Sequence, residues 1–174
     1  MTHILHIDSS ANLTTSVSRA ASAKIVADLG GTVTYRDLAT TPLPQIDGEW
    51  ATARLSDPDT RSQSDKDSLA LSDVLVSEMQ AADTIVIGAP IYNFAAPASL
   101  KLWMDLVARP RVTFKYLPDG PVGLLTGRNV VVTVASGGVP VGSPSDHLTP
   151  HIKTFFGLLG ITDVAVLVAK DIVP

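Results

Sequence analysis

The sequence has 174 residues, 45% hydrophobic and 17% charged, a balance that allows one globular domain with a core but not two. Its net charge of −4 and its lack of a basic block disfavour a protein that binds nucleic acid through phosphate contacts. Because the chain contains no cysteine, disulfides, thiolate nucleophiles and cysteine-ligated metal sites are excluded.

Short β-rich runs alternate with helical patterns along the chain. Strands are predicted at 3–8, 32–38, 84–89, 129–135 and 163–169, and helices at 16–29, 66–82, 97–108 and 147–159. The last three strands are continuous runs, mainly of Val, Ile, Leu and Ala, which is typical of strands covered on both faces. The alternation therefore predicts an α/β fold with a doubly wound sheet of five parallel strands, in one domain spanning residues 1–174.

Local signals indicate where two of the helices begin. Ser64 is predicted as the N-cap of the second helix, where its hydroxyl would accept a free backbone N–H. One face of that helix would carry Leu71, Leu75 and Met79. Pro97 fits the first turn of the third helix, because a missing N–H costs nothing there.

Two segments lack a sustained pattern. Residues 39–63 are rich in Pro, Thr, Asp and Ser and are predicted to form a long loop. Residues 110–127 combine a short β-like run, VTFKY, with turn residues at 118–121. Neither segment is predicted to be a domain boundary.

No targeting or membrane segment is recognised in the sequence. The first residues, MTHILHIDSS, have neither a basic region nor a long apolar core. No apolar run approaches the roughly 20 residues that span a bilayer. A cytoplasmic enzyme or binding protein is therefore expected.

Three of the predicted strand ends carry residues suited to a ligand. In an open parallel sheet, ligands bind beyond the carboxyl ends of the strands. The first strand is followed by a loop with six Ser or Thr hydroxyls within 9–18, directly before a helix whose N-terminus favours a phosphate. The P-loop and dinucleotide glycine motifs are absent, and a polar loop with Ser16 as a simple N-cap is the alternative interpretation.

Aromatic and glycine residues follow two further strands. Tyr92, Asn93 and Phe94 lie between a finished strand and a proline, where flat apolar surface and an amide suit a flat heteroaromatic ligand. Gly137 and Gly138 follow the fourth strand and allow backbone N–H groups to approach a ligand closely. A flexible turn is the simpler interpretation of the Gly-Gly pair alone.

Several segments together resemble one known family over essentially the whole chain. They are SSANLTTSVS, PIYNF, LKLWMDLVARPRVTFKY, GPVGLLTG, the SGG turn and TPHIKTFFGLLGI. The family they resemble is the flavodoxin-like FMN-dependent NADH:azoreductases, which reduce quinones and azo compounds. The resemblance implies a flavodoxin-like fold, FMN as cofactor and a homodimer with the site at its interface.

The resemblance also implies roles for particular residues. The FMN phosphate would be held by Ser10, Ser16, Ser18 and the backbone at Val17. The isoalloxazine would be bound by Ile91, Tyr92, Asn93, Phe94, Gly137 and Gly138. Ala135 and Ser136 in the same turn would also bind the cofactor, although the family often has Ser-Arg there, and Pro140 replaces a histidine that can follow the Gly-Gly. Tyr116 and Phe94 would line the substrate pocket, with Tyr116 on the partner's side.

By the same resemblance, two electrons would pass from NADH or NADPH to a quinone or azo compound with ping-pong kinetics. No obligatory catalytic side chain and no metal ligand set is recognised, and His147 and His151 are favoured as structural residues. The acceptor and the choice of nicotinamide cofactor stay open. A non-enzymatic flavodoxin-type electron carrier is the alternative, although a net charge of −4 is weak for an acidic docking face.

The chain stops at Pro174, just after the fifth strand, whereas the family normally continues into a final helix. The resemblance therefore implies that a final helix is missing from this chain. A sheet covered on both faces predicts that the native protein continues into an amphipathic helix.

Overall fold

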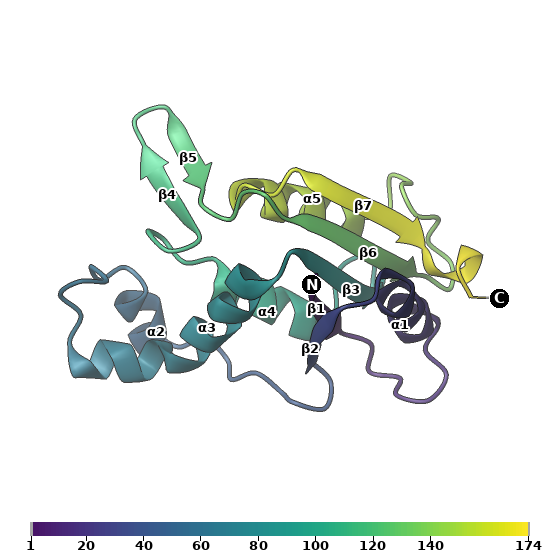
Figure 1. The fold of residues 1–174 in the computed structure, drawn as a ribbon, viewed down its shortest axis with the longest axis horizontal. Coiled ribbons are helices and arrows are strands. Elements are labelled where there is room, and N and C mark those ends of the chain that lie inside the picture. Colours follow the sequence, from purple (N-terminus) through teal and green to yellow (C-terminus); the bar gives the residue numbers. More distant parts are fainter. Residues whose placement is uncertain (1, 174) are drawn as a thin grey trace.

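Residues 2–173 are described by the computed structural model, in which five parallel strands form a sheet of order β2-β1-β3-β6-β7 (Figure 1). The strands are β1 (His3–Asp8), β2 (Thr32–Asp37), β3 (Thr84–Pro90), β6 (Asn129–Ala135) and β7 (Asp163–Val168). Their parallel pairing confirms the predicted doubly wound sheet. Pro174, past which a further helix is expected from the sequence, lies outside the described residues.

The strand order reverses between β1 and β3. From β1 the chain moves outward to β2 on one side, and from β3 it moves outward through β6 to β7 on the other. The crossovers diverge at this point, which leaves a crevice at the carboxyl ends of β1 and β3. The topology therefore places a ligand site where the sequence has its hydroxyl-rich loop and its aromatic turn.

Four helices fill the crossovers between the strands: α1 (Val17–Leu29), α3 (Gln63–Ala81), α4 (Ala98–Val107) and α5 (Leu148–Leu158). The predicted start of α3 was wrong, because Ser62 and not Ser64 is its N-cap and accepts the N–H of Asp65 at 3.1 Å. The earlier cap lengthens the helix and adds intrahelical hydrogen bonds. Of its predicted buried face, Leu75 and Met79 are buried, but Leu71 is only partly so.

The segment 39–63 is not a continuous loop, as the sequence predicted. It contains the short helix α2 (Gly48–Ala53), which packs against α3. Asp47 caps this helix by accepting the N–H of Trp50 at 2.8 Å, and the indole of Trp50 is buried. The sequence signal for this helix was a capping side chain, Asp47, three residues before the large apolar Trp50. The polar residues around this pair favoured the interpretation as a loop.

The two faces of the sheet have different characters, because successive strand residues point to opposite sides. One face contributes Leu5, Ile7, Ile85, Ile87, Val130, Val132 and Val134 to a core shared with α3, α4 and α5. On the other face, the His6 ring forms a hydrogen bond with the Ser22 hydroxyl of α1 at 2.9 Å. The Thr133 hydroxyl donates to the Ser18 carbonyl of α1 at 3.1 Å. The face that supports α1 therefore combines polar groups with the buried apolar side chains of Ile4 and Val86.

Gly88 on β3 explains how closely α1 approaches the sheet. A Cβ at this position would strike the carboxylate of Asp8 and lie 2.8 Å from the Ser22 hydroxyl and 3.0 Å from the Ser18 carbonyl. Helix α1 buries only small side chains, those of Ser18, Ala21 and Ser22. Close packing at this point holds the N-terminus of α1 beside the ends of β1 and β3.

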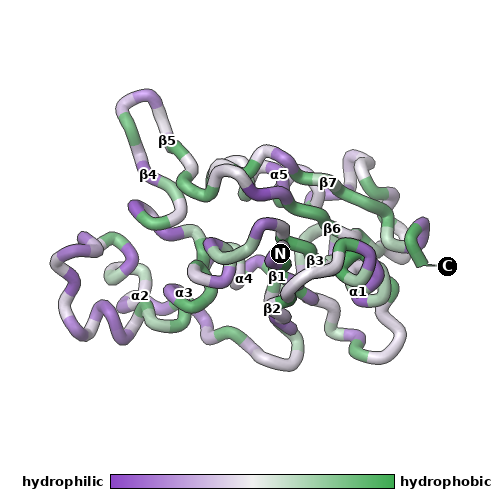
Figure 2. Tube along the Cα trace, viewed as in Figure 1, coloured by the Kyte–Doolittle hydropathy of each residue, from purple (hydrophilic) through white to green (hydrophobic). Residues whose placement is uncertain are grey.

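The segment 110–127 forms an antiparallel hairpin of β4 (Phe114–Leu117) and β5 (Gly120–Gly123), which projects from the body in Figure 1. Phe114 is buried at its base, whereas Tyr116 is 72% exposed and packs edge-on against the Phe114 ring. Figure 2 shows polar residues at the tip and hydrophobic residues further down both arms. Within residues 2–173, no helix combines the length and apolar character that crossing a bilayer requires.

Candidate functional site

A cavity of about 400 Å³ lies at the carboxyl ends of the strands, between the loops that follow them. Four loops line it, the ones after β1, β3, β6 and β7. The lining residues are Ser10, Asn12, Thr15, Ser16, Val17, Pro90, Ile91, Tyr92, Val134, Ala135, Ser136, Gly137, Val139, Pro140, Val141, Val168 and Lys170. Three of these loops are the strand ends to which the sequence assigned a ligand.

Most of the predicted site residues meet at this cavity. Those that line it are Ser10, Ser16, Val17, Ile91, Tyr92, Ala135, Ser136 and Gly137. Ser18 is fully buried and lies behind Ser16, with their hydroxyl oxygens 3.1 Å apart. Asn93, Phe94 and Gly138 are exposed next to the lining residues, and Tyr116 lies on the hairpin.

Sequence reasoning missed several lining residues. Asn12 and Thr15 belong to the recognised hydroxyl-rich loop, so their composition was the available signal. Val139 and Val141 follow the Gly-Gly turn, and Lys170 follows β7, where the sequence showed no ligand pattern. Lys170 comes to the cavity only because β7 is parallel to β6 and ends at the same edge.

The loop after β1 is held by its own polar side chains. The amide oxygen of Asn12 accepts the N–H groups of Thr14 at 3.1 Å and Thr15 at 3.0 Å, and its amide nitrogen donates to the Thr15 hydroxyl at 2.8 Å. Ser16 is the N-cap of α1, and its hydroxyl accepts the N–H of Arg19. The first N–H groups of a helix lack intrahelical partners and carry partial positive charge. This end of the cavity therefore suits an anion such as a phosphate.

The turn after β3 has an unusual backbone. Asn93 and Phe94 have φ values of 48° and 74°, and backbone hydrogen bonds between Tyr92 and Ala95 close the turn in both directions at 3.0 and 3.1 Å. Positive φ at both central residues is what a type I′ turn requires, and Asn tolerates it while a bulky Phe does not. The strained Phe94 is 54% exposed, so burial of its ring does not account for it.

Two contacts fix this turn relative to its neighbours. The Tyr92 hydroxyl accepts the N–H of Ala11 at 3.2 Å, which joins the turn to the loop after β1. The Phe94 carbonyl accepts the N–H of His147 at 2.9 Å, which joins it to the start of α5. The aromatic turn therefore has a defined position at the cavity.

The loop after β6 closes another side of the cavity. The Ser136 hydroxyl accepts the N–H of Val139 at 2.8 Å. A Cβ at Gly137 or Gly138 would meet no atom within 4 Å, so the protein itself does not need glycine at either position. Open space beside Gly137 is consistent with a ligand that lies against the backbone there.

Asp146 anchors the far end of this loop to α5. Its carboxylate accepts the N–H of Gly142 at 2.8 Å and both the N–H and the hydroxyl of Thr149 at 2.9 and 2.6 Å. Burial alone would raise the pKa of Asp146, but these hydrogen bonds outweigh it and hold the pKa below its usual value. The loop is thus tied down by an ionised carboxylate. His147 and His151 lie outside the set of residues that line the cavity.

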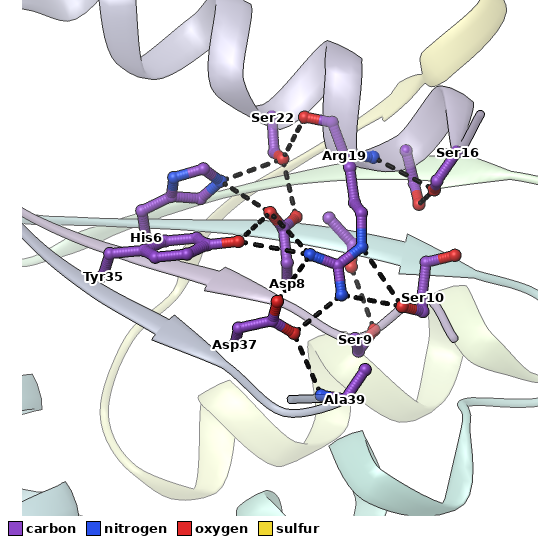
Figure 3. A network of polar contacts seen from close by, with 12 residues as sticks. His6, Asp8, Ser9, Ser10, Ser16, Arg19, Ser22, Tyr35, Asp37 and Ala39 are labelled. Atoms are coloured by element: carbon purple, nitrogen blue, oxygen red, sulfur yellow. Dashed lines mark hydrogen bonds and ion pairs between the residues drawn. The ribbon is translucent and has the colours of Figure 1, made fainter. Parts of the chain in front are cut away.

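A charged network lies directly behind the hydroxyl-rich loop (Figure 3). The Arg19 guanidinium donates to both carboxylate oxygens of Asp37, at 2.7 and 2.9 Å, and lies 3.6 Å from the carboxylate of Asp8. The Asp8 carboxylate accepts from the hydroxyls of Ser22 at 2.8 Å and Tyr35 at 3.0 Å. Asp8 and Asp37 are register partners on β1 and β2, so the parallel pairing itself brings the two carboxylates together.

In a doubly wound parallel sheet, ligands bind at the switch point, and the hydroxyl-lined helix N-terminus at this cavity is suited to a phosphate. The profile of the family described as flavodoxin-like fold matches residues 2–173, and the chain belongs to that family. The FMN-dependent NADH:quinone oxidoreductase 1 of Jannaschia sp. (strain CCS1) is 52% identical over 169 residues, covering 97% of this chain and 88% of the relative.

Two further similarities agree with this one. The FMN-dependent NADH:quinone oxidoreductase of Erythrobacter litoralis (strain HTCC2594) is 47% identical, covering 98% of this chain and 88% of the relative. The crystal structure of an FMN-dependent NADH-azoreductase from Bacillus anthracis strain Ames Ancestor, in complex with FMN, superposes with a TM-score of 0.81 at 25% identity. That match covers 95% of this chain and 85% of the other.

Proposed function

We propose that this protein is an FMN-dependent oxidoreductase that passes two electrons from NADH to quinones or azo compounds. The observation that carries the proposal is the cavity, which has the hydroxyl-rich N-terminus of α1 at one end and the strained aromatic turn at its side. The names of the relatives, NADH:quinone oxidoreductase and NADH-azoreductase, support the choice of donor and acceptor.

The residues around the cavity fit FMN. Its volume of about 400 Å³ lies within the roughly 300–1,000 Å³ of small-molecule sites. The hydroxyls of Ser10 and Ser16 and a helix N-terminus suit a phosphate monoester. The 40% exposed Tyr92 and the open space at Gly137 suit a flat ring that packs against side chain and backbone together.

Each predicted residue would then have a specific task. Ser10, Ser16 and the backbone N–H of Val17 would bind the phosphate, while Ser18 would support Ser16 from behind. Ile91, Tyr92, Asn93 and Phe94 would orient the ring system through the closed turn, and the segment 135–138 would offer backbone N–H groups to its polar edge. When bound, FMN would supply two-electron redox chemistry, and the chain would bind, orient and shield it.

The use of this one cavity by both reactants would also set the order of binding. Donor and acceptor would have to occupy the same space in turn, so we expect ping-pong kinetics. Backbone N–H groups at the loop after β6 would stabilise negative charge that develops at the ring edge, because fixed donors in a sheltered site need little reorganisation. No side-chain proton donor is assigned to the reaction.

A homodimer is part of the proposal. Tyr116 is 72% exposed and Leu117 is 46% exposed on the projecting hairpin, and large exposed apolar residues of this kind are common at interfaces. The hairpin of one protomer would reach the cavity of its partner and place Tyr116 beside the acceptor. Light scattering should then report twice the chain mass, and full activity in a monomer would contradict a shared site. A cytoplasmic location stays a prediction from the sequence.

The absorption spectrum of the purified protein and a steady-state assay test the function together. Visible flavin bands, release of FMN on heating and oxidation of NADH with a quinone in the absence of any partner protein are expected. Absence of bound flavin after reconstitution with FMN would contradict the proposal. NADH consumption that requires a second protein would instead favour an electron carrier.

A further inference from the structure

Arg19 connects three segments that meet behind the hydroxyl-rich loop (Figure 3). It extends from the first turn of α1 and forms a bidentate pair with Asp37 at the end of β2. The same guanidinium donates twice to the Ser10 carbonyl, from Nε at 3.1 Å and from Nη2 at 2.7 Å. Its own backbone N–H points to the Ser16 hydroxyl at 3.4 Å.

These contacts involve both serines that line the phosphate end of the cavity. Two donors on one carbonyl fix the peptide of Ser10 and therefore the direction of its side chain, whose hydroxyl accepts the N–H of Asn12 at 3.3 Å. The contact with Ser16 comes from the backbone N–H of Arg19, as at any helix N-cap, so the side chain of Arg19 acts on the Ser10 peptide alone. Arg19 itself is not among the residues that line the cavity.

The charge of Arg19 is compensated inside the protein. Its side chain is 13% exposed and that of Asp37 is 12% exposed, with the Asp8 carboxylate 3.6 Å away. The hydrogen bond with Asp37 raises the pKa of Arg19 despite burial. Burial would raise the pKa of Asp37, but the hydrogen bonds from Arg19 and Ala39 and the charge of Arg19 lower it. The pair is therefore fully ionised and its geometry is fixed by the bidentate contact.

The Asp8 carboxylate is itself held firmly. The Ser22 hydroxyl donates to one of its oxygens at 2.8 Å, and the Tyr35 hydroxyl donates to the other at 3.0 Å. His6 Nε2 lies 3.5 Å from that second oxygen. The guanidinium thus sits between two carboxylates whose positions are set by β1 and β2, and it cannot move without leaving buried charge unpaired.

We propose that Arg19 is a positioning residue for the phosphate of FMN, whose side chain acts through Ser10 and does not touch the ligand. The inference rests on the proposed function. Riboflavin lacks the phosphate. The preference of the site for FMN over riboflavin would therefore depend on the network behind the loop as well as on the serines themselves. Neutral hydroxyl and backbone donors bind the phosphate, and the buried ion pair keeps them in place.

Arg19→Lys tests this role, because lysine keeps the charge but cannot bind Asp37 and the Ser10 carbonyl with the same planar fork. Arg36→Lys is a matched control. Arg36 on β2 forms a comparable bidentate pair with Glu78 on α3, with side chains 17% and 14% exposed, and neither residue lines the cavity. Apo forms of the wild type and both variants are titrated with FMN and with riboflavin, and each is melted thermally.

The expected result is that Arg19→Lys weakens FMN about tenfold, the equivalent of roughly 1.4 kcal/mol, and changes riboflavin affinity by less than about twofold. Arg36→Lys should lower the melting temperature without changing the ratio of the two affinities. If Arg19→Lys leaves the ratio of FMN affinity to riboflavin affinity unchanged, whether neither affinity falls or both fall equally, the positioning role is overturned. If Arg19→Lys does not fold, Asp37→Asn must show the selective loss of FMN affinity.

The same titrations separate this inference from the function on which it rests. A wild type that binds FMN and oxidises NADH, with an unchanged affinity ratio in the variants, refutes the positioning role alone. A wild type that binds neither flavin refutes both.

Discussion

Replacing Asn93 by alanine and, separately, by glycine distinguishes ligand binding from backbone conformation at the aromatic turn. Asn93 is exposed, has a φ of 48° and is the first central residue of the turn closed by Tyr92 and Ala95. Alanine removes the amide and introduces a residue that disfavours positive φ. Glycine removes the same amide but accepts this backbone conformation without steric cost.

The two substitutions should therefore have the same effect on affinity and different effects on stability. A non-glycine residue without a local polar side chain loses about 1–2 kcal/mol in the left-handed region. A loss of about 1 kcal/mol lowers the melting temperature of a chain of this size by about 2–4 °C. If Asn93 binds the flavin as proposed, its amide would contribute hydrogen bonds of about 1 kcal/mol each, so FMN affinity should fall by about tenfold in both variants.

A flavin titration and a thermal melt of the apo proteins measure both quantities. Asn93→Gly should melt close to the wild type, while Asn93→Ala melts lower, and both should bind FMN more weakly by the same factor. Unchanged FMN affinity in the two variants, with a lower melting temperature for Asn93→Ala alone, would show that Asn93 serves only the turn. The assignment of this turn to the flavin would then be wrong.

Three further outcomes follow from contacts around the site. Gly88→Ala should destabilise the protein by about 1–3 kcal/mol in denaturant unfolding, because its Cβ would strike Asp8, whereas Gly48→Ala, where a Cβ meets nothing within 4 Å, should be close to neutral. Burial and the Asp8 carboxylate raise the pKa of Tyr35 to about 12, so the stability it contributes is complete below its ordinary pKa of 10.0 and is lost as the pH rises from there towards 12. An ultraviolet titration should show one late phenol that Tyr35→Phe removes, and a single transition near pH 10 would contradict this. Burial by itself would raise the pKa of Asp146, but its hydrogen bonds outweigh burial and lower it. The stability that Asp146 contributes is therefore present above its ordinary pKa of 3.8 and is lost as the pH falls below that value. Asp146→Ala should cost about 1–2 kcal/mol in thermal melts at neutral pH, and this difference should shrink in acid; a difference that stays constant would exclude a role for the charge.

Much of the fold could be predicted from local patterns. The continuous apolar runs correctly predicted parallel strands, and β3 is buried along its whole length, but the expectation that β7 is covered on both faces was wrong, because its residues are only partly buried or exposed. Once the strands are parallel, their carboxyl ends meet at one edge, so Ser16, Tyr92 and Gly137 could be placed at a common site without any knowledge of strand order. The hydroxyl content of the first loop and the amide between two aromatics then indicated the chemistry of the ligand.

Local patterns were less reliable where two signals compete. Ser62 and Ser64 are both suitable caps for α3, and their sequence neighbours do not distinguish them. Trp50 packs its helix against α3, a contact that stabilises α2 although the surrounding residues favour a loop. The longer helix favours Ser62 as the cap, whereas packing against α3 selects the helix at Trp50 over a loop.

The contacts that complete the site are set by the tertiary structure. Ser16 faces the cavity while Ser18 is buried, because the closeness of α1 to Gly88 determines the rotation of the helix. Phe94, which has a positive φ, accepts a hydrogen bond from the N–H of His147, the N-cap of α5, 53 residues further along the chain.

The network around Arg19 is the clearest case. Asp8 and Asp37 become neighbours only through the register of β1 and β2, and the guanidinium reaches both only because α1 packs over them. In the sequence these are three ordinary charged residues at unremarkable spacings. Which segments form parallel strands, and which loops therefore share an edge, follows from side-chain type and order along the chain. Which charges pair across segments follows from strand order and helix rotation, and these depend on the packing of the whole chain.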